Sequence, residues 1–370
     1  MLRTILVPLD GSRLSEKAIP YATTLAQAAG AELVFMRSVG GSFHDGLKKE
    51  ARDYLDSKVA DARKMGLHVE AQVSEDEAGP SIQQFAEDIR PDIIVMSTHG
   101  RSALGRVVWG SVADYVLHHV TVPTFLVGKN VETGWTAGRR PVFLVPLDGS
   151  SLSAEALPLA EELAVAFHGE ITLVEAIDSD TWLLSAVDPW DGYALAEPVM
   201  TGLGSAQAEA ARQHLGTLAT RLSARGIPTT FTVQEGNAAS VIRQAVRDYQ
   251  ATAVVMATHG RDGATRLLLG SVTDAIVRSA RLPVVVVRPQ GILPPTAAGR
   301  NEPGHPEQNV LFPMTISEVE LTRVALDRLL NGGGHQIDDT APVQELLQRL
   351  NRIQGSENPT IKHVAAGSSR

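Results

Sequence analysis

The sequence predicts an α/β protein with two tandem, doubly wound domains, each built on a five-stranded parallel sheet, and a partly helical C-terminal tail. An internal repeat supports the two domains, because TILVPLDGSRLSEKA (residues 4–18) returns as VFLVPLDGSSLSAEA (residues 142–156). Apolar strands alternate with helical segments of about a dozen residues, which is typical of βαβ units on a parallel sheet. The apolar runs DIIVM and PVVVV fit strands that are covered on both faces.

Both copies have the same order of elements. An alanine-rich helix follows the first strand and ends at Gly30 or Gly169, since glycine suits a helix C-terminus. Further helices separate the later strands, and the last helix begins at the Gly-Ser pair of residues 110–111 or 270–271. The expected strands are residues 4–8, 31–39, 67–73, 92–96 and 123–128 in the first copy, and residues 142–146, 170–177, 228–234, 253–256 and 283–289 in the second.

Composition shifts divide the chain into four parts. Domain 1 is expected at residues 1–128, a polar linker at 129–140, domain 2 at 141–289 and the tail at 290–370. The second copy carries an insertion at residues 178–200, whose tryptophans either cover a strand end as a lid or pack on the surface.

The tail begins with a connector rich in Pro and Gly. Two amphipathic segments follow, at residues 315–334 and 338–353. These segments either dock onto the chain's own domains or bind a protein partner or a second chain. The sequence supports both arrangements.

Charge and composition exclude several classes of protein. The chain has 370 residues, a net charge of −9 and no cysteine, which excludes thiol chemistry and disfavours binding to nucleic acid or to anionic membranes. No apolar stretch reaches the roughly 20 residues that span a bilayer. The first residues, MLRTILVPLDGS, lack the features of a signal peptide. We therefore expect a cytoplasmic protein.

A second repeated stretch carries the candidate site. MSTHGRSALGRVVWGS (residues 96–111) and MATHGRDGATRLLLGS (residues 256–271) each place His-Gly just past a strand end and Gly-Ser at a helix start. The glycines let a ligand approach the backbone, and the first amides of a helix attract anions. With arginines on the nine-residue loop between the glycines, this arrangement suits a polyphosphate. It is not a P-loop, because the chain contains no Gly-Lys-Ser or Gly-Lys-Thr.

An acidic residue follows the first strand of each copy, Asp10 and Asp148 in VPLDGS. A carboxylate only accepts hydrogen bonds and suits the hydroxyls of a ribose. These residues indicate a nucleotide site, but a purely structural explanation stays open. Ser-x-x-Asp at residues 111–114 and 271–274 is a capping-box pattern, and the Asp-Gly-Ser of residues 10–12 can be a simple turn before a helix.

These motifs resemble those of the universal stress protein family, and the two copies resemble a tandem member over residues 1–127 and 141–289. The shared features are VPLDGS after the first strand, THGR after the fourth, and a glycine pattern close to G-x2-G-x9-G-S/T. The resemblance implies a Rossmann-like fold that binds ATP or another adenine nucleotide, with or without Mg²⁺, and at most slow hydrolysis. It also implies pairing through the last strands, which would join the copies as a pseudo-dimer and let two chains form a homodimer.

The resemblance also assigns site residues by position. Adenosine is expected beside the first two strand ends, and the ribose and phosphates beside the glycine loop. The first copy contributes Pro8, Asp10, Ser38, Met96, Ser97, His99, Gly100, Arg101, Gly110, Ser111 and Val112, and the second contributes Pro146, Asp148, Ala176, Met256, Ala257, His259, Gly260, Arg261, Gly270, Ser271 and Val272.

Both copies depart from the family motif at its first glycine, which is Ser97 in one and Ala257 in the other. These residues keep the backbone amide but disfavour the positive φ that glycine tolerates. Two functions therefore stay open: a nucleotide-binding regulatory protein, and an interaction module whose sites have degenerated. An ATP-pyrophosphatase-like enzyme is disfavoured, because the chain lacks a Ser-Gly-Gly-x-Asp-Ser loop. We expect neither catalytic residues nor side chains that bind a metal.

Overall fold

The computed structural model describes residues 2–40, 45–98, 110–131, 140–177, 197–258 and 270–289, without the side chains of Asp45 and of residues 197–205. Most of the expected linker and insertion, and the whole tail, lie outside these residues. The two amphipathic segments predicted for the tail therefore stay predictions.

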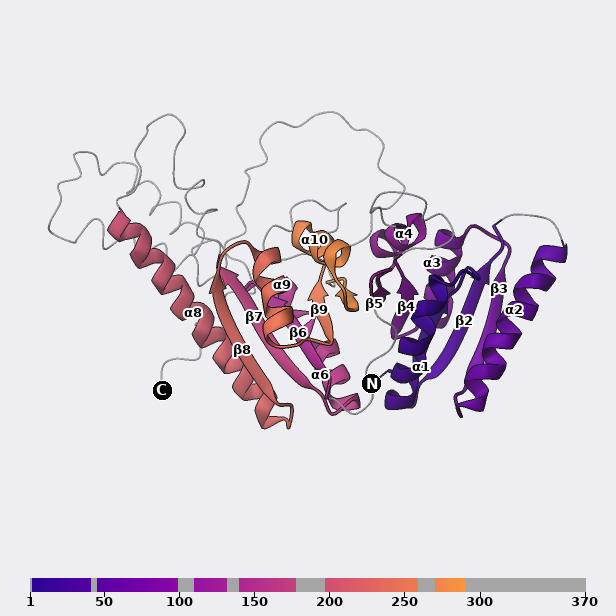
Figure 1. Ribbon diagram of the computed structural model, residues 1–370, viewed down its shortest axis with the longest axis horizontal. Helices are drawn as coiled ribbons and strands as arrows, with labels where there is room; N and C mark the ends of the chain where they lie inside the picture. The colour runs from indigo at the N-terminus through magenta and orange to yellow at the C-terminus, as the bar shows by residue number, and fades with distance from the viewer. Residues whose placement is uncertain are drawn as a thin grey trace, which may run out of the picture. The chain divides into compact units, whose positions relative to one another are not determined.

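The first half alternates strands and helices in the order expected from the sequence (Figure 1). Its strands are β1 (Thr4–Pro8), β2 (Glu32–Ser38), β3 (Val69–Ser74), β4 (Ile93–Ser97) and β5 (Thr124–Val127). Its helices are the short 3-10 helix η1 (Ser15–Lys17), α1 (Ala18–Ala29), α2 (Asp45–Lys64), α3 (Ala78–Ile89) and α4 (Ser111–His119).

The second half repeats this order. Its strands are β6 (Val142–Leu147), β7 (Glu170–Ile177), β8 (Thr229–Glu235), β9 (Ala253–Ala257) and β10 (Val284–Val287). Its helices are α5 (Ser151–Ala154), α6 (Leu157–Ala166), α8 (Glu197–Ala224), α9 (Ala238–Asp248) and α10 (Ser271–Ser279). Helix α8 takes the place of α2 and begins inside the predicted insertion. Of the helices in the described ranges, none combines the length and the apolar character that a membrane crossing requires.

All ten strands form one sheet in the order β3-β2-β1-β4-β5-β10-β9-β6-β7-β8. Within each half the strands pair in parallel, which confirms the predicted doubly wound, five-stranded arrangement of each copy. Strands β5 and β10 pair antiparallel, with Val285 opposite Phe125. The last strands therefore join the two copies inside one chain, in the manner expected of a pseudo-dimer.

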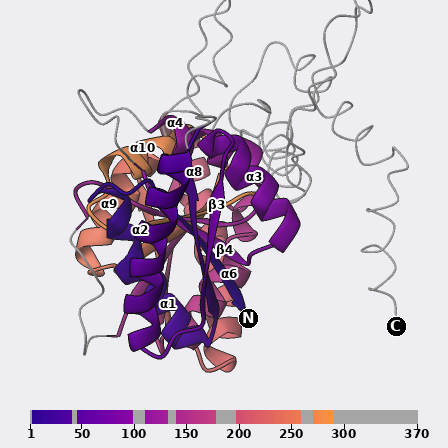
Figure 2. The same cartoon turned by 90° about the vertical axis from the view of Figure 1, so that its right-hand side faces the viewer.

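The sheet buries apolar side chains on both faces. Phe35, Phe125 and Phe143 lie on one face, packed with residues of α1, α2, α6 and α8. Leu126 and Val254 lie on the other face, packed with residues of α3, α4, α9 and α10. Figure 2 shows this layering in the first half, where α2 and α3 lie on opposite sides of the strands. Each fully buried aliphatic or aromatic side chain contributes about 1.5–3 kcal/mol, so these two layers hold the helices on the sheet.

The helices that follow the first strand of each copy end differently. α1 ends at Gly30, which has a φ of 67°, as predicted for a C-terminal glycine. The prediction for Gly169 is wrong, because α6 ends earlier and His168 adopts the left-handed conformation, with a φ of 49°. Gly169 provides space instead, since a Cβ atom there would lie 2.7 Å from the carbonyl oxygen of Pro141.

Helix α3 packs against α4 through a residue without a side chain. Gly79 is buried in α3, and a Cβ atom there would lie 2.7 Å from Cγ of Tyr115 in α4. The Tyr115 ring also stacks on His119, with ring centroids 4.0 Å apart. The second copy has Ala239 and Ala275 at the positions of Gly79 and Tyr115. Each copy therefore fills the same space between its helices with a different pair.

We expect Gly79→Ala to lower the free energy of unfolding by about 1–3 kcal/mol, because the new methyl group would overlap the Tyr115 ring. Urea unfolding followed by circular dichroism measures this loss. Gly46→Ala in α2 is the control, since a Cβ atom there meets nothing within 4 Å. The double variant with Tyr115→Ala should lose less than the sum of the two single losses. Equal stability of Gly79→Ala and wild type would show that α4 can move away.

Candidate functional site

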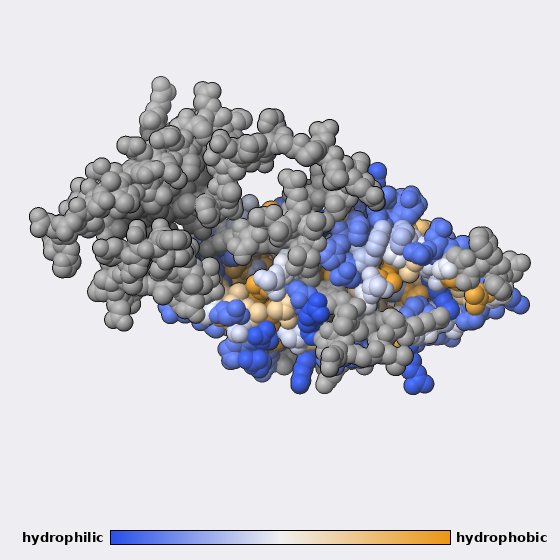
Figure 3. Space-filling view, turned by 90° about the horizontal axis from the view of Figure 1, so that it is seen from above, coloured by the Kyte–Doolittle hydropathy of each residue, from blue (hydrophilic) through white to orange (hydrophobic). Residues whose placement is uncertain are grey.

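The candidate sites lie where the winding of each half reverses. Strand β1 pairs with β2 on one side and β4 on the other, and β6 lies in the same way between β7 and β9. In open parallel sheets, ligands bind at the carboxyl edge beside such a reversal. Figure 3 looks onto the molecule from above, where the described surface is mostly hydrophilic with smaller apolar areas.

A tight turn follows β1 and presents Asp10 at this edge. The Ser12 N–H donates to Asp10 Oδ1 at 2.8 Å, and the Ser15 N–H donates to Ser12 Oγ at 3.1 Å. Gly11 has a φ of 81°, which side chains disfavour. The second copy repeats the network at Asp148, Gly149, Ser150 and Ser153, with distances of 2.9 and 3.1 Å and a φ of 79°. The Asp-Gly-Ser turn that the sequence suggested is therefore present in both copies. It places an acidic residue at the end of β1 and of β6.

The helices that follow β4 and β9 begin without a side-chain cap in the described part of the chain. Gly110 precedes α4, and its N–H donates to Thr98 O at 2.8 Å. Gly270 precedes α10, and its N–H donates to Thr258 O at 2.9 Å. The serine of each Gly-Ser pair is the first residue inside its helix, so the capping-box interpretation is wrong in both copies. The first backbone N–H groups of these helices have no partner within the helix and stay available to an anion.

Six of the predicted site residues are buried or half-buried, and four of them belong to the layer between the sheet and helices α4 and α10. Met96 and Met256 are buried beneath these helices, and Val112 and Val272 pack there from the helices themselves. Ser97 and Ala257 are also buried, but they follow Met96 and Met256 in their strands and therefore face the opposite side of the sheet. The side chains of Met96, Met256, Val112 and Val272 are occupied by packing. A ligand at this edge would therefore meet the backbone of these four residues and not their side chains.

The ends of the second strands differ between the copies. Ser38 ends β2 and donates its hydroxyl to the carbonyl oxygen of Asp76. Ala176 takes this position in β7 and has no hydroxyl to donate. Pro8 and Pro146 lie near the ends of β1 and β6 and are half-buried in both copies.

Helix α10 is tied to its strand by a contact that α4 lacks. The buried Thr273 hydroxyl donates to the carbonyl oxygen of Ala257 at 3.0 Å. Ala113 holds the equivalent position in α4 and has no group to donate. The start of α10 is therefore anchored more firmly than the start of α4.

The remaining predicted residues lie outside the described ranges: His99, Gly100, Arg101, His259, Gly260 and Arg261. Their placement stays a prediction, as does the role of the tryptophans in the insertion. Within the residues that the structure describes, no group of three or more His, Asp or Glu side chains could hold a metal ion.

A side-chain cluster that the sequence did not indicate joins α2 to the turn after β1. Tyr54 donates its hydroxyl to Glu16 Oε1 at 3.0 Å, and Lys58 forms an ion pair with the same carboxylate at 2.9 Å. The buried Arg37 lies over the Tyr54 ring, 5.0 Å from its centroid, and pairs with Glu50 at 3.3 Å. Burial and the hydrogen bond with Glu16 raise the pKa of Tyr54 well above its ordinary value. The cluster holds α2 against the segment that presents the first acidic residue.

The second copy lacks this cluster. The positions of Glu16, Tyr54 and Lys58 are held by Ala154, His214 and Leu218. Glu175 takes the place of Arg37 in β7 and is only 4% exposed. A buried carboxyl group therefore replaces a buried guanidinium next to the second strand end. Comparing the repeats position by position could have shown these changes, but not that the residues meet in space.

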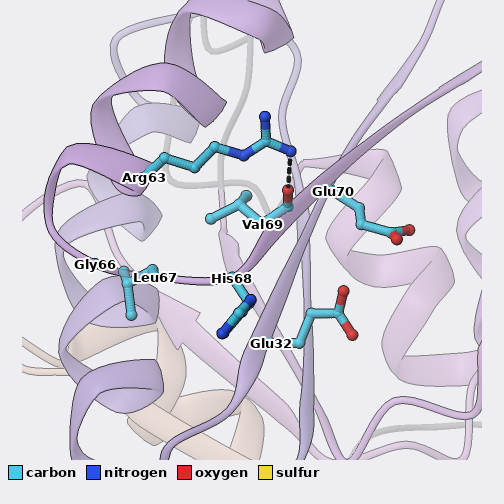
Figure 4. Close-up of a pocket in the computed structure, with 7 residues that line it drawn as sticks. All are labelled: Glu32, Arg63, Gly66, Leu67, His68, Val69 and Glu70. Carbon is cyan, nitrogen blue, oxygen red and sulfur yellow. Dashed lines mark hydrogen bonds between the residues drawn. The ribbon is translucent and has the colours of Figure 1, made fainter.

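A separate depression lies at the opposite, amino-terminal edge of the first half (Figure 4). It has a volume of about 470 Å³ and is lined by Glu32, Arg63, Gly66, Leu67, His68, Val69 and Glu70. Arg63 donates to the Val69 carbonyl oxygen at 3.0 Å and is thereby held at its rim. Because Glu32 and Val69 begin β2 and β3, this depression is remote from the carboxyl edge.

The doubly wound sheet, with an acidic turn after the first strand and a glycine before the last helix of each copy, defines the chain as an α/β protein of the Rossmann-like class. The chain belongs to the universal stress protein family, whose sequence pattern matches residues 1–128 and 141–288. Two matches in one chain make it a tandem member of this family.

Relatives support this assignment. A universal stress protein of Mycolicibacterium smegmatis is 25% identical over 306 residues, which cover 77% of this chain and 97% of that protein. One of Mycobacterium tuberculosis is 30% identical over 202 residues, which cover 53% of this chain and 62% of that protein. The crystal structure of a universal stress protein from Archaeoglobus fulgidus covers 77% of this chain and 98% of its own, with a TM-score of 0.57 at 19% identity. This last likeness shows the fold.

We expect Tyr54→Phe to lower the free energy of unfolding by about 1 kcal/mol near pH 8, because it removes the hydrogen bond to Glu16. The pKa of Tyr54 is raised in the folded protein, so its contribution is present below the ordinary tyrosine pKa of about 10 and is lost as the pH rises above it. The difference between wild type and variant should therefore shrink toward about pH 11.

Urea unfolding at both pH values tests this expectation. Tyr249→Phe is the control, since its hydroxyl makes no hydrogen bond within the described residues. A difference for Tyr54→Phe that stays constant across the two pH values would contradict the role of the hydroxyl.

Proposed function

We propose that each copy binds an adenine nucleotide, ATP in the first instance, at the carboxyl edge of its sheet, and that binding regulates conformation or association. The observation that carries this proposal is the uncapped start of α4 and α10 directly beyond β4 and β9. A helix start without a capping side chain leaves several N–H groups and a positive dipole end for phosphate oxygens.

The acidic turn supports the same site. Asp10 and Asp148 stand at the end of the neighbouring strand, where a carboxylate would accept hydrogen bonds from ribose hydroxyls. Adenine would then lie toward the ends of β2 and β7, and the glycines before α4 and α10 would let the phosphates approach. Any Mg²⁺ in the site would be bound by the phosphates of the nucleotide. We assign no hydrolytic role to any residue.

A second candidate is an interaction module that no longer binds nucleotide. Ser97 and Ala257, in place of the family's glycine, favour this alternative, as does the burial of many predicted site side chains. The rest of the proposal concerns the chain as a whole. It includes a cytoplasmic location, a homodimer, a linker at residues 129–140 and a tail at 290–370 that docks or binds a protein partner.

The first test is to denature the purified protein, quantify released nucleotide per chain by chromatography, and titrate ATP by calorimetry. About two nucleotides per chain would support both sites, and about one would support a single active copy. If neither released nucleotide nor binding heat were found, the interaction-module alternative would replace the proposal.

We expect Gly110→Val to weaken ATP binding in the first copy by about tenfold or more, because a branched side chain would block the approach of phosphate. Gly270→Val should do the same in the second copy, and the double variant should bind no ATP. Both glycines have negative φ and extended ψ, so valine should leave the fold intact. Gly46→Val, at an open position in α2, is the control. Unchanged affinity in the double variant would remove these glycines from the site.

A further inference from the structure

The helix layer formed by α3, α4, α9 and α10 differs in charge between its two halves. The acidic face, which belongs to the first half, consists of Asp76, Glu77, Glu87, Asp88 and Asp114, all exposed. Glu75 is also exposed, but it is paired with Lys48 of α2 in the opposite layer, and the second half has the exposed Glu235 at the same position. The basic face, which belongs to the second half, consists of Arg243, Arg247, Arg278 and Arg281, of which all but Arg243 are exposed. Arg90 in the first half, and Asp248 and Asp274 in the second, reduce this contrast without reversing it.

Some equivalent positions of the repeat carry this difference, whereas Asp88 and Asp114 have acidic equivalents in Asp248 and Asp274. Glu87 of α3 corresponds to Arg247 of α9, and Thr121 after α4 corresponds to Arg281 after α10. Because α3 and α9 have the same place in the fold, packing against the sheet does not require either charge. The difference therefore concerns what meets the outside of these helices.

Four residues of these faces form no ion pair within the described part of the chain. Their hydrogen bonds go to neutral side chains of their own helices: Glu87 to Gln83, Asp88 to Gln84, Arg243 to Ser240 and Arg247 to Gln244, at 2.5–3.1 Å. By contrast, Arg278 is paired with Asp274 in α10, at 2.7 Å. The acidic and basic faces therefore keep charge that a second molecule can meet.

We propose that two chains associate through this layer, with the acidic face of each chain against the basic face of its partner. All four helices pack on the same side of the sheet, so both faces are presented together. A two-fold axis would bring two acidic-to-basic contacts together at once and close the assembly as a dimer. The pairing of β5 with β10 inside the chain already occupies the strands by which single copies would otherwise join.

A second copy of this chain fits the layer better than a polyanion does. The acidic face and the net charge of −9 would repel nucleic acid from the neighbouring basic face. A complementary partner must place a basic surface opposite the acidic face and an acidic surface opposite the basic face. This inference rests on the homodimer proposed above and names its surface, but it does not depend on nucleotide binding.

The test exchanges charge on one face at a time in the full chain. The acidic variant carries Arg247→Glu and Arg281→Glu, and the basic variant carries Glu87→Arg and Asp88→Arg. Sedimentation equilibrium should show a wild-type dimer whose Kd rises about tenfold or more between about 50 mM and about 500 mM salt. Each variant alone should have a Kd at least about tenfold higher than wild type, because two like-charged faces then meet.

Mixing the two variants in equal amounts should restore a dimer of about wild-type Kd, since every contact then joins opposite charges again. The control variant carries Lys49→Glu and Arg212→Glu, two exposed positions on the helices of the opposite layer, with the same change in net charge as the acidic variant. It should dimerise like wild type. Circular dichroism and urea unfolding verify that each variant is folded.

The outcomes separate this inference from the proposals that precede it. A wild-type dimer that neither exchange weakens would assign the dimer to another surface. Weakening by both exchanges without recovery on mixing would overturn the pairing of acidic with basic faces. A chain that stays monomeric at all concentrations would overturn both the homodimer and its surface, whatever the nucleotide content.

Discussion

The antiparallel pairing of β5 with β10 is the interaction on which the rest of the structure depends. Each copy alone would leave the backbone groups of a short, fully buried last strand unpaired at a sheet edge. Pairing Val285 with Phe125 satisfies these groups and makes the two apolar faces continuous across both copies. Arg288, just after β10, adds a hydrogen bond of 2.5 Å to the His118 carbonyl oxygen at the end of α4. The two copies thus share one core.

A shared core does not make the two copies chemically equal. Both keep the acidic turn after the first strand, and both start the last helix after a glycine that is bonded to the preceding strand. The two copies differ in side chains that form neither the turn nor the start of the last helix. Arg37 and Glu175 have opposite charge at one position, and the Thr273 hydroxyl adds a hydrogen bond between α10 and β9 that Ala113 cannot make in α4. The two copies therefore share the backbone geometry at the carboxyl edge of the sheet, while the differing side chains give each copy its own electrostatics there.

Much of the fold could be predicted from the sequence because its signals are local. Apolar runs mark the strands, and VPLDGS marks the turn after the first strand. Because the same patterns occur in both copies, each assignment in one copy supports the assignment in the other. The signals that misled were also local. Gly169 suggested a helix end, but its lack of a side chain makes room for the carbonyl oxygen of Pro141. Pro141 directly precedes β6 and is far from Gly169 in the sequence. Ser111 suggested a cap, but the helix begins one residue too early for its side chain to act as one.

By itself, the sequence determined the two doubly wound copies, the acidic residue after each first strand and the glycine before each last helix. Short-range periodicity and glycine spacing are sufficient for these features. Only the tertiary structure decided that Arg37, Tyr54, Lys58 and Glu16 form one cluster, and that the charges of α3 and α9 share one layer. These residues come from separate elements, and their contacts depend on how the sheet orders its strands. No local pattern records that order.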